Sequence, residues 1–250
     1  MITLGVLLLS VTVAYYLYAT IARSNLGKLE YTVSFGDTTG QPNGFESIYP
    51  GSLVPSLSWD HPRWTDVEYD AYNAFLEGFT SLDGNGVQEE MGVLTAATKI
   101  EIPAIGLDSI IKALEVVNYG DVQGWETPKD VVGHIPTTSN PGEAGNGYLF
   151  GHLQSPIRGE GSVFRNLTRV PDLLRNGQDV YIVLHNEEDV AYLYQVSQTA
   201  VIPQEEFTLQ PSAGSTVTLV ACVPEYVYDY RLLVTAKLVG IKGWTPLPPL

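Results

Sequence analysis

Three residue types that could together carry out acyl transfer lie in the second half of the chain: Cys222, His152 and Arg231. Cys222 ends a β-branched run and is the only cysteine of the 250 residues, so no internal disulfide can form. A free cysteine is often a buried small hydrophobic residue, and this alternative stays open until the neighbours are considered. A nucleophilic cysteine needs a base or cation that favours the thiolate and a donor that stabilises the oxyanion.

His152 is the best placed of the four histidines for this chemistry. It closes a short apolar run directly after Gly151, and a glycine there permits close backbone approach to a site at a strand end. His134 remains a second candidate. His61 lies in an acidic segment and His185 lies beside an expected hairpin loop, so we expect both at the surface.

Strand alternation relates the arginine to the cysteine. In an extended strand Cys222 shares one face with Thr218 and Val220, and Arg231 begins a second apolar run nine positions later. The two runs predict a hairpin in which Arg231 is adjacent to Cys222. The alternative is a surface cation that pairs with a loop carboxylate.

Charge and composition exclude several classes of function. The net charge is -15, and none of the 13 basic residues forms a run, so we expect no binding of nucleic acid. One cysteine and scattered histidines do not have the spacing of a zinc site. The acidic residues 187–189 are more typical of a solvent-exposed loop than of a calcium site. We therefore expect no metal and no cofactor.

The chain changes character near residue 97. Residues 30–97 carry 11 acidic residues against one basic residue, whereas residues 98–250 carry 17 against 10. After residue 97, short runs rich in Val, Ile, Tyr and Thr are separated by glycine and proline, which is typical of an antiparallel sheet or barrel. These runs are 99–103, 109–116, 148–152, 179–185, 190–197, 215–221 and 230–240. We expect a hairpin loop over 186–189 and a helical turn over 163–167.

The N-terminal stretch has the length and composition of a membrane anchor. Residues 1–22 carry no charged side chain, and a spanning helix needs about 20 apolar residues. The stretch lacks the basic first region and the cleavage site of a signal peptide, so an uncleaved anchor over 1–23 is favoured. Arg23 and Lys28 follow it, and the positive-inside rule taken alone would keep that flank in the cytoplasm.

The rest of the chain divides into three parts. Residues 24–97 form an acidic stalk or linker with many turn signals and a short amphipathic helix over about 64–80. Whether this segment is a lid or a spacer stays open. Residues 98–242 form the folded domain, and the proline-rich residues 243–250 form a disordered tail.

Four short motifs, taken in order, resemble those of the sortases, which are membrane-anchored cysteine transpeptidases of bacterial surfaces. The motifs are Gly151–His152, Val163–Leu167, Thr218–Cys222 and Arg231–Val234. The resemblance covers roughly residues 98–242. It implies an all-β fold, a closed eight-stranded sortase-like β-barrel with short helices, preceded by one N-terminal transmembrane helix. It also implies a single-pass protein of the cell membrane with its catalytic domain on the extracellular face.

The resemblance further implies that Cys222, His152 and Arg231 converge at one end of the barrel. The Cys222 thiolate would attack a backbone carbonyl in a sorting signal of the Leu-Pro-x-Thr-Gly kind, giving a thioester. His152 would protonate the departing amine, and Arg231 would hold the substrate backbone and the oxyanion. The expected partners are surface proteins or pilins that bear the sorting motif. The expected acceptor is an amine from a cell-wall precursor or a pilin lysine.

The residues before the cysteine are expected to contact the substrate: Thr218, Leu219 and Ala221. The family usually has a threonine where Ala221 stands, so a hydroxyl that could touch the substrate is absent. The nine-residue step from Cys222 to Arg231 is closer to the pilin-polymerising types, class C, D or E, than to class A. The segment 60–64 faintly resembles the aspartate-proline-aromatic lid of pilin sortases, with broken spacing.

Other classes fit the order of the residues less well. L,D-transpeptidases place the histidine much closer to the cysteine, and papain-like hydrolases place the cysteine first. A non-enzymatic alternative stays open, in which an anchored extracellular β-barrel binds a partner without catalysis. Cys222 would then be a core residue and Arg231 a surface cation.

Overall fold

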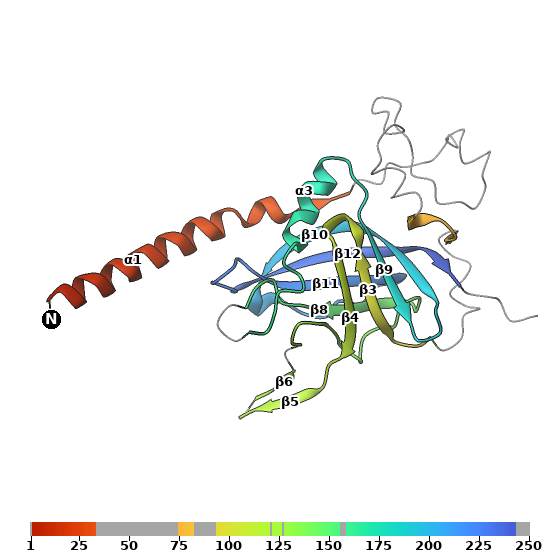
Figure 1. Ribbon diagram of the computed structural model, residues 1–250, viewed down its shortest axis with the longest axis horizontal. Coiled ribbons are helices and arrows are strands. Elements are labelled where there is room, and N and C mark those ends of the chain that lie inside the picture. The colour runs from red at the N-terminus through yellow and green to blue at the C-terminus, as the bar shows by residue number, and fades with distance from the viewer. Residues whose placement is uncertain are drawn as a thin grey trace, which may run out of the picture.

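The computed structural model describes residues 2–33, 75–82, 94–120, 122–126, 128–155 and 159–243. Its main sheet has ten strands, eight of which close into a barrel (Figure 1). Around the barrel the order is β10, β9, β3, β4, β7, β8, β11 and β12, and the pairing of β12 with β10 closes the ring. The β4–β7 and β8–β11 pairs are parallel, and the other barrel pairs are antiparallel.

The barrel confirms the expected all-β architecture. Its strands are β3 (Ala97–Ile102), β4 (Leu107–Ala113), β7 (Val132–His134), β8 (Gly145–Phe150), β9 (Tyr181–Asn186), β10 (Ala191–Pro203), β11 (Ser215–Val223) and β12 (Tyr230–Lys242). All seven runs predicted after residue 97 overlap one of these strands. The eighth, β7, has only three residues, which is too short for a recognisable alternation. The separate hairpin of β5 (Val116–Tyr119) and β6 (Val122–Trp125) was also not predicted.

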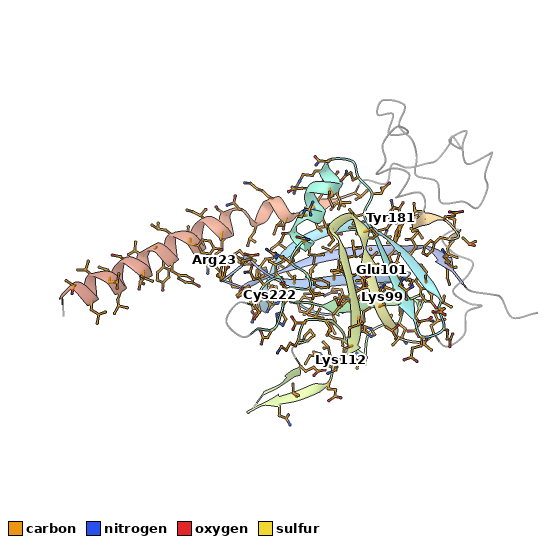
Figure 2. All side chains as sticks on the ribbon, in the orientation of Figure 1. Arg23, Lys99, Glu101, Lys112, Tyr181 and Cys222 are labelled. Atoms are coloured by element: carbon orange, nitrogen blue, oxygen red, sulfur yellow. The ribbon has the colours of Figure 1, made fainter. Side chains whose placement is uncertain are left out.

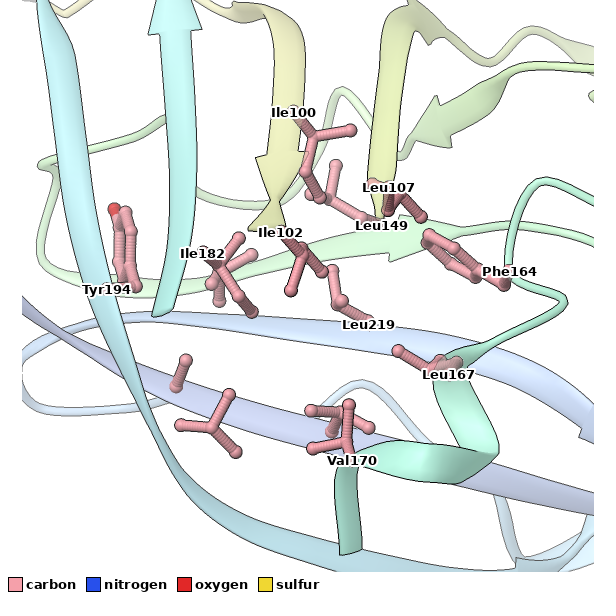
Figure 3. Close-up of a cluster of buried hydrophobic side chains, with 14 of the residues drawn as sticks. Ile100, Ile102, Leu107, Leu149, Phe164, Leu167, Val170, Ile182, Tyr194 and Leu219 are labelled. Atoms are coloured by element: carbon pink, nitrogen blue, oxygen red, sulfur yellow. The ribbon is translucent and has the colours of Figure 1, made fainter. Parts of the chain in front are cut away.

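Alternate side chains of the strands fill the barrel (Figure 3). Ile100 and Ile102 of β3 and Leu219 of β11 are each 0% exposed and belong to one hydrophobic cluster. The expected turn 163–167 contributes Phe164 and Leu167 to the same cluster. The short helices η3 (Leu167–Arg169) and α3 (Val170–Arg175) follow that turn and continue the packing.

The N-terminal helix leaves the barrel as a long rod (Figure 1). Helix α1 spans Ile2–Ser24, and the segment Thr3–Leu29 is long and apolar enough to cross a membrane by length and composition. The 3-10 helix η1 (Leu26–Leu29) then inserts Leu26 into the barrel cluster, and β1 (Tyr31–Thr32) pairs with β10. The connection between helix and barrel is therefore packed.

The described ends of the expected stalk pack on the barrel. Residues 75–82 include β2 (Thr80–Ser81), which pairs with β12, and Leu76 and Phe79 cover the outer face of β9 and β10. Phe75 and Leu76 are helical, but the helix expected over 64–80 ends there, because residues 77–78 form a turn and Thr80 begins β2. Residues 64–74 of that helix, the lid resemblance at 60–64, His61 and the tail after Gly243 lie outside the described residues.

The hairpin loop expected over 186–189 joins β9 to β10. The side-chain oxygen of Asn186 accepts hydrogen bonds from the backbone N–H groups of Glu188 and Val190, at 3.0 and 2.9 Å. Asp189 has a φ of 58°, a left-handed conformation that aspartate tolerates in tight turns. Another short 3-10 helix, η2 (Pro103–Ile105), joins β3 to β4.

Replacing Leu219 by alanine is expected to lower the free energy of unfolding by about 2–5 kcal/mol, because it removes a fully buried side chain from a close-packed core. Equilibrium denaturation by urea measures the change. Val116→Ala is the matched control, since Val116 is 56% exposed and its truncation should change stability by no more than about 0.5 kcal/mol. Equal effects of the two substitutions would contradict the placement of Leu219.

Candidate active site

Three neighbouring strands carry the candidate residues to one end of the barrel. In the antiparallel β11–β12 pair, Cys222 lies directly opposite Arg231. In the parallel β8–β11 pair, Phe150 lies opposite Val220, and the Gly151 N–H donates to the Val220 carbonyl at 3.2 Å. Two residues further along the same two chains stand His152 and Cys222. The candidate histidine, thiol and arginine therefore lie on neighbouring segments of the chain, at corresponding positions of the strand register.

The thiol lies on the outer face of the barrel. Leu219, Ala221 and Val223 belong to the interior cluster, so alternation directs Cys222 to the other side. The expected sharing of faces holds across the hairpin, because Val220 lies opposite Leu233 as Cys222 lies opposite Arg231. Cys222 is half-buried. It is neither a core residue nor a fully solvated one.

Two opposing effects act on the thiol. Burial raises the pKa of Cys222 above its ordinary value because it disfavours the charged thiolate, and the positive charge of Arg231 lowers the pKa. Burial is the larger effect, so the pKa of the free side chain is raised on balance. The thiolate at this position thus depends on the cation beside it.

Arg231 is held in place by three hydrogen bonds. Its Nη1 donates to the carbonyl oxygens of Tyr228 and Tyr230, both at 3.0 Å, and its Nη2 donates to Oε1 of Gln204 at 2.7 Å. Gln204 opens the 3-10 helix η4 (Gln204–Glu206), and its backbone N–H donates to the Asp229 carbonyl at 2.9 Å. Gln204 therefore holds the Arg231 guanidinium through its side chain and the loop before Arg231 through its backbone.

Gln204 was not among the residues predicted from the sequence. It lies 27 positions from Arg231, and a glutamine before a loop carries no signal of its own. The pairing of β10 with β12, which puts Ile202 opposite Arg231, brings it within reach. Only the closure of the barrel produces this contact.

His152 points toward a carboxylate. Its Nε2 lies 3.9 Å from Oε2 of Glu160, and that oxygen also accepts a hydrogen bond from the Ser155 hydroxyl at 2.8 Å. Within the described part of the chain, His152 Nε2 is buried without a hydrogen-bond partner. A buried ring nitrogen left in this way is available to a proton donor or acceptor that arrives with a ligand.

The backbone around His152 is tightly packed. The Phe164 N–H donates to the His152 carbonyl at 2.9 Å, which joins the expected turn 163–167 to the site. A Cβ on Gly151 would lie 2.6 Å from the Phe164 ring and 2.7 Å from Val163. The expected need for glycine before the histidine thus has a steric cause: a larger residue would collide with the turn.

The loop between Cys222 and Arg231 contacts the segment that follows His152. The Tyr228 hydroxyl donates to the Gln154 carbonyl at 2.8 Å, and Gln154 Nε2 donates to the Tyr226 hydroxyl at 3.3 Å. These bonds join the β11–β12 loop (Pro224–Asp229) to the chain just beyond β8. They add a direct link between the two halves of the candidate site.

A second loop covers the outer face of the same strands. Phe207, in the connection from β10 to β11, makes edge-to-face ring contacts with Tyr148 and Phe150, with centroids 6.1 and 5.9 Å apart. The Tyr148 hydroxyl accepts a hydrogen bond from the Gln210 N–H at 2.7 Å. This loop therefore covers the outer face of β8.

The structure places the expected substrate-binding residues differently from the catalytic candidates. The side chains of Leu219 and Ala221 are 0% and 1% exposed in the barrel interior, so neither can touch a ligand on the outer face. Thr218 faces outward, but it is 2% exposed and its hydroxyl donates to Oδ1 of Asn146 at 3.0 Å. Strand alternation is the physical reason, since residues 219 and 221 are out of phase with 222.

The other described histidines are not part of this cluster. His134 is buried on β7, and burial lowers its pKa because it disfavours the charged imidazolium. It lines a cavity of about 10 Å³ together with Tyr194, and Cys222 does not line that cavity. His185, expected at the surface, is partly exposed on β9 with its Nε2 3.7 Å from Oε2 of Glu101. Among the described residues no group of three His, Cys, Asp or Glu side chains could hold a metal ion.

Comparisons with known proteins point to one family. The family model described as the sortase domain matches residues 100–239. Sortase C1 from Streptococcus agalactiae is 24% identical, with a TM-score of 0.42, 57% of this chain covered and 66% of that one. Sortase A of Listeria monocytogenes is 18% identical, with a TM-score of 0.43, 60% of this chain covered and 92% of that one. The chain spans about two thirds of the streptococcal structure, and no curated protein sequence matches it.

Replacing Arg231 by methionine is expected to slow labelling of Cys222 by methyl methanethiosulfonate near pH 7. The guanidinium lowers the thiol pKa, so its removal raises that pKa further and shrinks the reactive thiolate fraction. At a pH below the pKa, raising the pKa by one lowers the thiolate fraction, and with it the rate, roughly tenfold. The measurement is the labelling rate as a function of pH. The midpoint of this pH profile should move to higher pH in the methionine variant.

Arg231→Lys is the matched control, because it keeps the positive charge and should move the profile less. The plateau at high pH reports access to the thiol, and it separates a change of ionisation from a change of packing. A methionine variant whose profile coincides with that of the parent would contradict an electrostatic role for Arg231.

Proposed function

The chain belongs to the sortase family, and on this premise we propose that it is a cysteine transpeptidase with Cys222 as nucleophile, His152 as acid and base, and Arg231 as oxyanion donor. The substrate is a polypeptide with a sorting signal of the Leu-Pro-x-Thr-Gly kind. The carrying observation is that the thiol lies directly across a strand pair from a fixed cation, and that His152, two residues beyond the Phe150–Val220 pair, has a buried Nε2 without a hydrogen-bond partner among the described residues.

The first half of the reaction is acyl transfer to the enzyme. The Cys222 thiolate attacks the carbonyl carbon of the scissile peptide bond, and the carbonyl oxygen becomes an oxyanion. The C–N bond then breaks as the His152 imidazolium gives its proton to the departing amine. A thioester and a neutral imidazole remain. The Glu160 carboxylate lies 3.9 Å from Nε2 of His152.

The second half returns the enzyme to its starting state. An incoming amine attacks the thioester carbonyl, and neutral His152 takes the proton that the amine loses. The C–S bond breaks, the new amide is released, and the thiolate and imidazolium are restored. A surface-protein or pilin substrate and a cell-wall or lysine amine acceptor fit this chemistry.

Arg231 is suited to the oxyanion because its geometry is set before substrate binds. Three hydrogen bonds to Tyr228, Tyr230 and Gln204 hold it, and a guanidinium has five N–H donors. The remaining donors are available to a carbonyl oxygen that gains charge. A donor that does not reorganise during the reaction stabilises the transition state more than one that must turn toward it.

The proposed location is the cell membrane, with α1 as a single span and the barrel on the extracellular face. Support comes from the apolar helix and from the family, whose members act at bacterial surfaces. Arg23 and Lys28 after the helix favour the opposite orientation by charge alone. Two charges favour a cytoplasmic orientation only weakly. The need for the enzyme to meet substrates at the bacterial surface favours the extracellular orientation more strongly.

One observation favours the alternative of a binding module without catalysis. Burial outweighs Arg231 in its effect on the thiol pKa, as in a structural cysteine. Substitution of Cys222 distinguishes the two functions. A transpeptidase without this thiol loses turnover, whereas a binding module keeps its affinity for its partner.

Cys222→Ala in the full chain is expected to abolish transfer of a sorting peptide to an amine, because no other cysteine can form the thioester. His152→Ala should lower the transfer rate by about 10²–10⁴-fold through loss of proton transfer. A fluorogenic peptide library with an added amine, followed by mass spectrometry of the product, measures both. His134→Ala is the matched control and should leave the chemical step largely intact. Transfer by the Cys222→Ala protein would refute the mechanism.

Gln204→Leu is expected to lower kcat/KM by about threefold to tenfold, because loss of one hydrogen bond to a charged group frees the guanidinium to move. Glu205→Gln, on the same 3-10 helix, is the control and should have little effect. Steady-state kinetics with the peptide found in the library provide the measurement. Equal kinetics for Gln204→Leu and the parent would show that the carbonyl contacts alone position Arg231.

A further inference from the structure

The loop between Cys222 and Arg231 is in direct contact with the N-terminal helix. The Tyr18 hydroxyl donates to the Glu225 carbonyl at 2.9 Å, and Arg23 Nε lies 2.8 Å from Oδ2 of Asp229. The rings of Tyr18 and Tyr226 meet edge to face, with centroids 6.4 Å apart. Figure 2 shows the labelled Arg23 and Cys222 at the same end of the barrel.

The helix is also fixed to the barrel beyond this contact. Ala19 is 2% exposed, and Leu26 of η1 is buried in the barrel cluster. The Thr199 hydroxyl donates to the Leu29 carbonyl at 2.7 Å. The chain from Tyr18 to Leu29 therefore follows the barrel surface as a packed element, so the depth of α1 in a membrane sets the height of the barrel.

The length of α1 determines that height. The segment from Ile2 to Tyr18 is about 25 Å long at 1.5 Å per residue, which is the lower limit for crossing the hydrocarbon core. Arg23 comes five residues later, about 7.5 Å further along the axis. The headgroup layer of each leaflet is about 5–7 Å thick, so Arg23 and its partner Asp229 reach its outer edge.

Exposed tyrosines mark the same level. Tyr15, Tyr16 and Tyr18 on the helix are 47%, 66% and 42% exposed, and Tyr226 on the loop is 48% exposed. The Tyr15 hydroxyl also contacts the Tyr226 carbonyl, at 3.4 Å. Amphipathic aromatic rings concentrate at the boundary between hydrocarbon and headgroups. Three of these tyrosines come from the helix, and the fourth comes from the loop that joins Cys222 to Arg231.

We propose that the β11–β12 loop (Pro224–Asp229) and the tyrosines of α1 form one surface that lies in the headgroup layer of a phospholipid bilayer. This inference rests on the proposed role of α1 as a membrane span. Cys222 and Arg231 flank the loop, so the reacting groups are held at the membrane surface. The β9–β10 hairpin lies at the other end of β10 and β12, about 35 Å away along the strands.

An environment-sensitive fluorophore at the loop tests the proposal. The full chain with Cys222→Ser and Glu225→Cys has one labelling position and keeps the backbone carbonyl that Tyr18 contacts. It is labelled with a nitrobenzoxadiazole dye and placed in vesicles of phosphatidylcholine and phosphatidylglycerol. Spin-labelled headgroup lipids should quench this dye at least about threefold more than the same dye at Glu187→Cys, on the distant hairpin.

A matched pair of variants shows whether the contact holds the loop at the membrane. Tyr18→Ala with Arg23→Glu removes the contacts that these two side chains make with the loop and should reduce quenching at position 225 toward the level at 187. Lys28→Glu makes the same change of charge just after the helix, and its side chain does not contact the loop among the described residues; it should keep the quenching.

Flotation of the same vesicles separates this inference from the proposed function. Protein that floats with the lipid but shows no more quenching at 225 than at 187 overturns the inference and leaves the anchor intact. Protein that does not float overturns the anchor itself, and the inference falls with it. Because Cys222→Ser removes the nucleophile, neither result depends on whether the parent chain is a transpeptidase.

Discussion

The register of β11 between its two neighbours is the constraint on which both the core and the candidate site depend. β11 pairs in parallel with β8 and antiparallel with β12. Leu219 and Ala221 thereby enter the barrel, and Cys222 faces outward beside Arg231. A slip of one residue would exchange the two sets and expose the apolar side chains to water. Burial of one face of the strand therefore also sets the direction of the thiol on the other.

The site combines a thiol whose pKa is raised by burial with a cation that lowers it. A thiol in water needs no such help, but it would also lack the packed surroundings that exclude water from an acyl intermediate. Arg231 opposes the effect of burial from a position that Gln204 and two backbone carbonyls hold. Reactivity is thus a property of the hydrogen-bonded group, and the thiol alone does not possess it.

The β11–β12 loop connects parts of the molecule that are distant in sequence. It joins the cysteine to the arginine, bonds to the segment after His152 through Tyr228, and contacts α1 through Glu225 and Asp229. The end of α1 and the candidate site therefore meet at one short loop, in a chain whose barrel packs directly against the end of its N-terminal helix.

The sequence by itself determined what depends on neighbouring residues. Strand alternation and β-branched composition predicted seven of the barrel strands, a long uncharged stretch predicted α1, and a nine-residue step predicted the pairing of Cys222 with Arg231. The same alternation already excluded Leu219 and Ala221 from the outer face, although the family resemblance favoured them as substrate contacts. Strand β7 was not predicted, because three residues are too few to show the alternation of apolar and polar side chains.

The tertiary structure decided every contact between distant segments. His152 reaches the level of Cys222, 70 positions away, only through the parallel β8–β11 pair, and Gln204 reaches Arg231 only through closure of β10 on β12. The docking of α1 on the β11–β12 loop joins residues more than 200 positions apart. Local patterns report which face of a strand is buried, but they carry no information on which strands meet. That choice is made by the packing of the whole barrel.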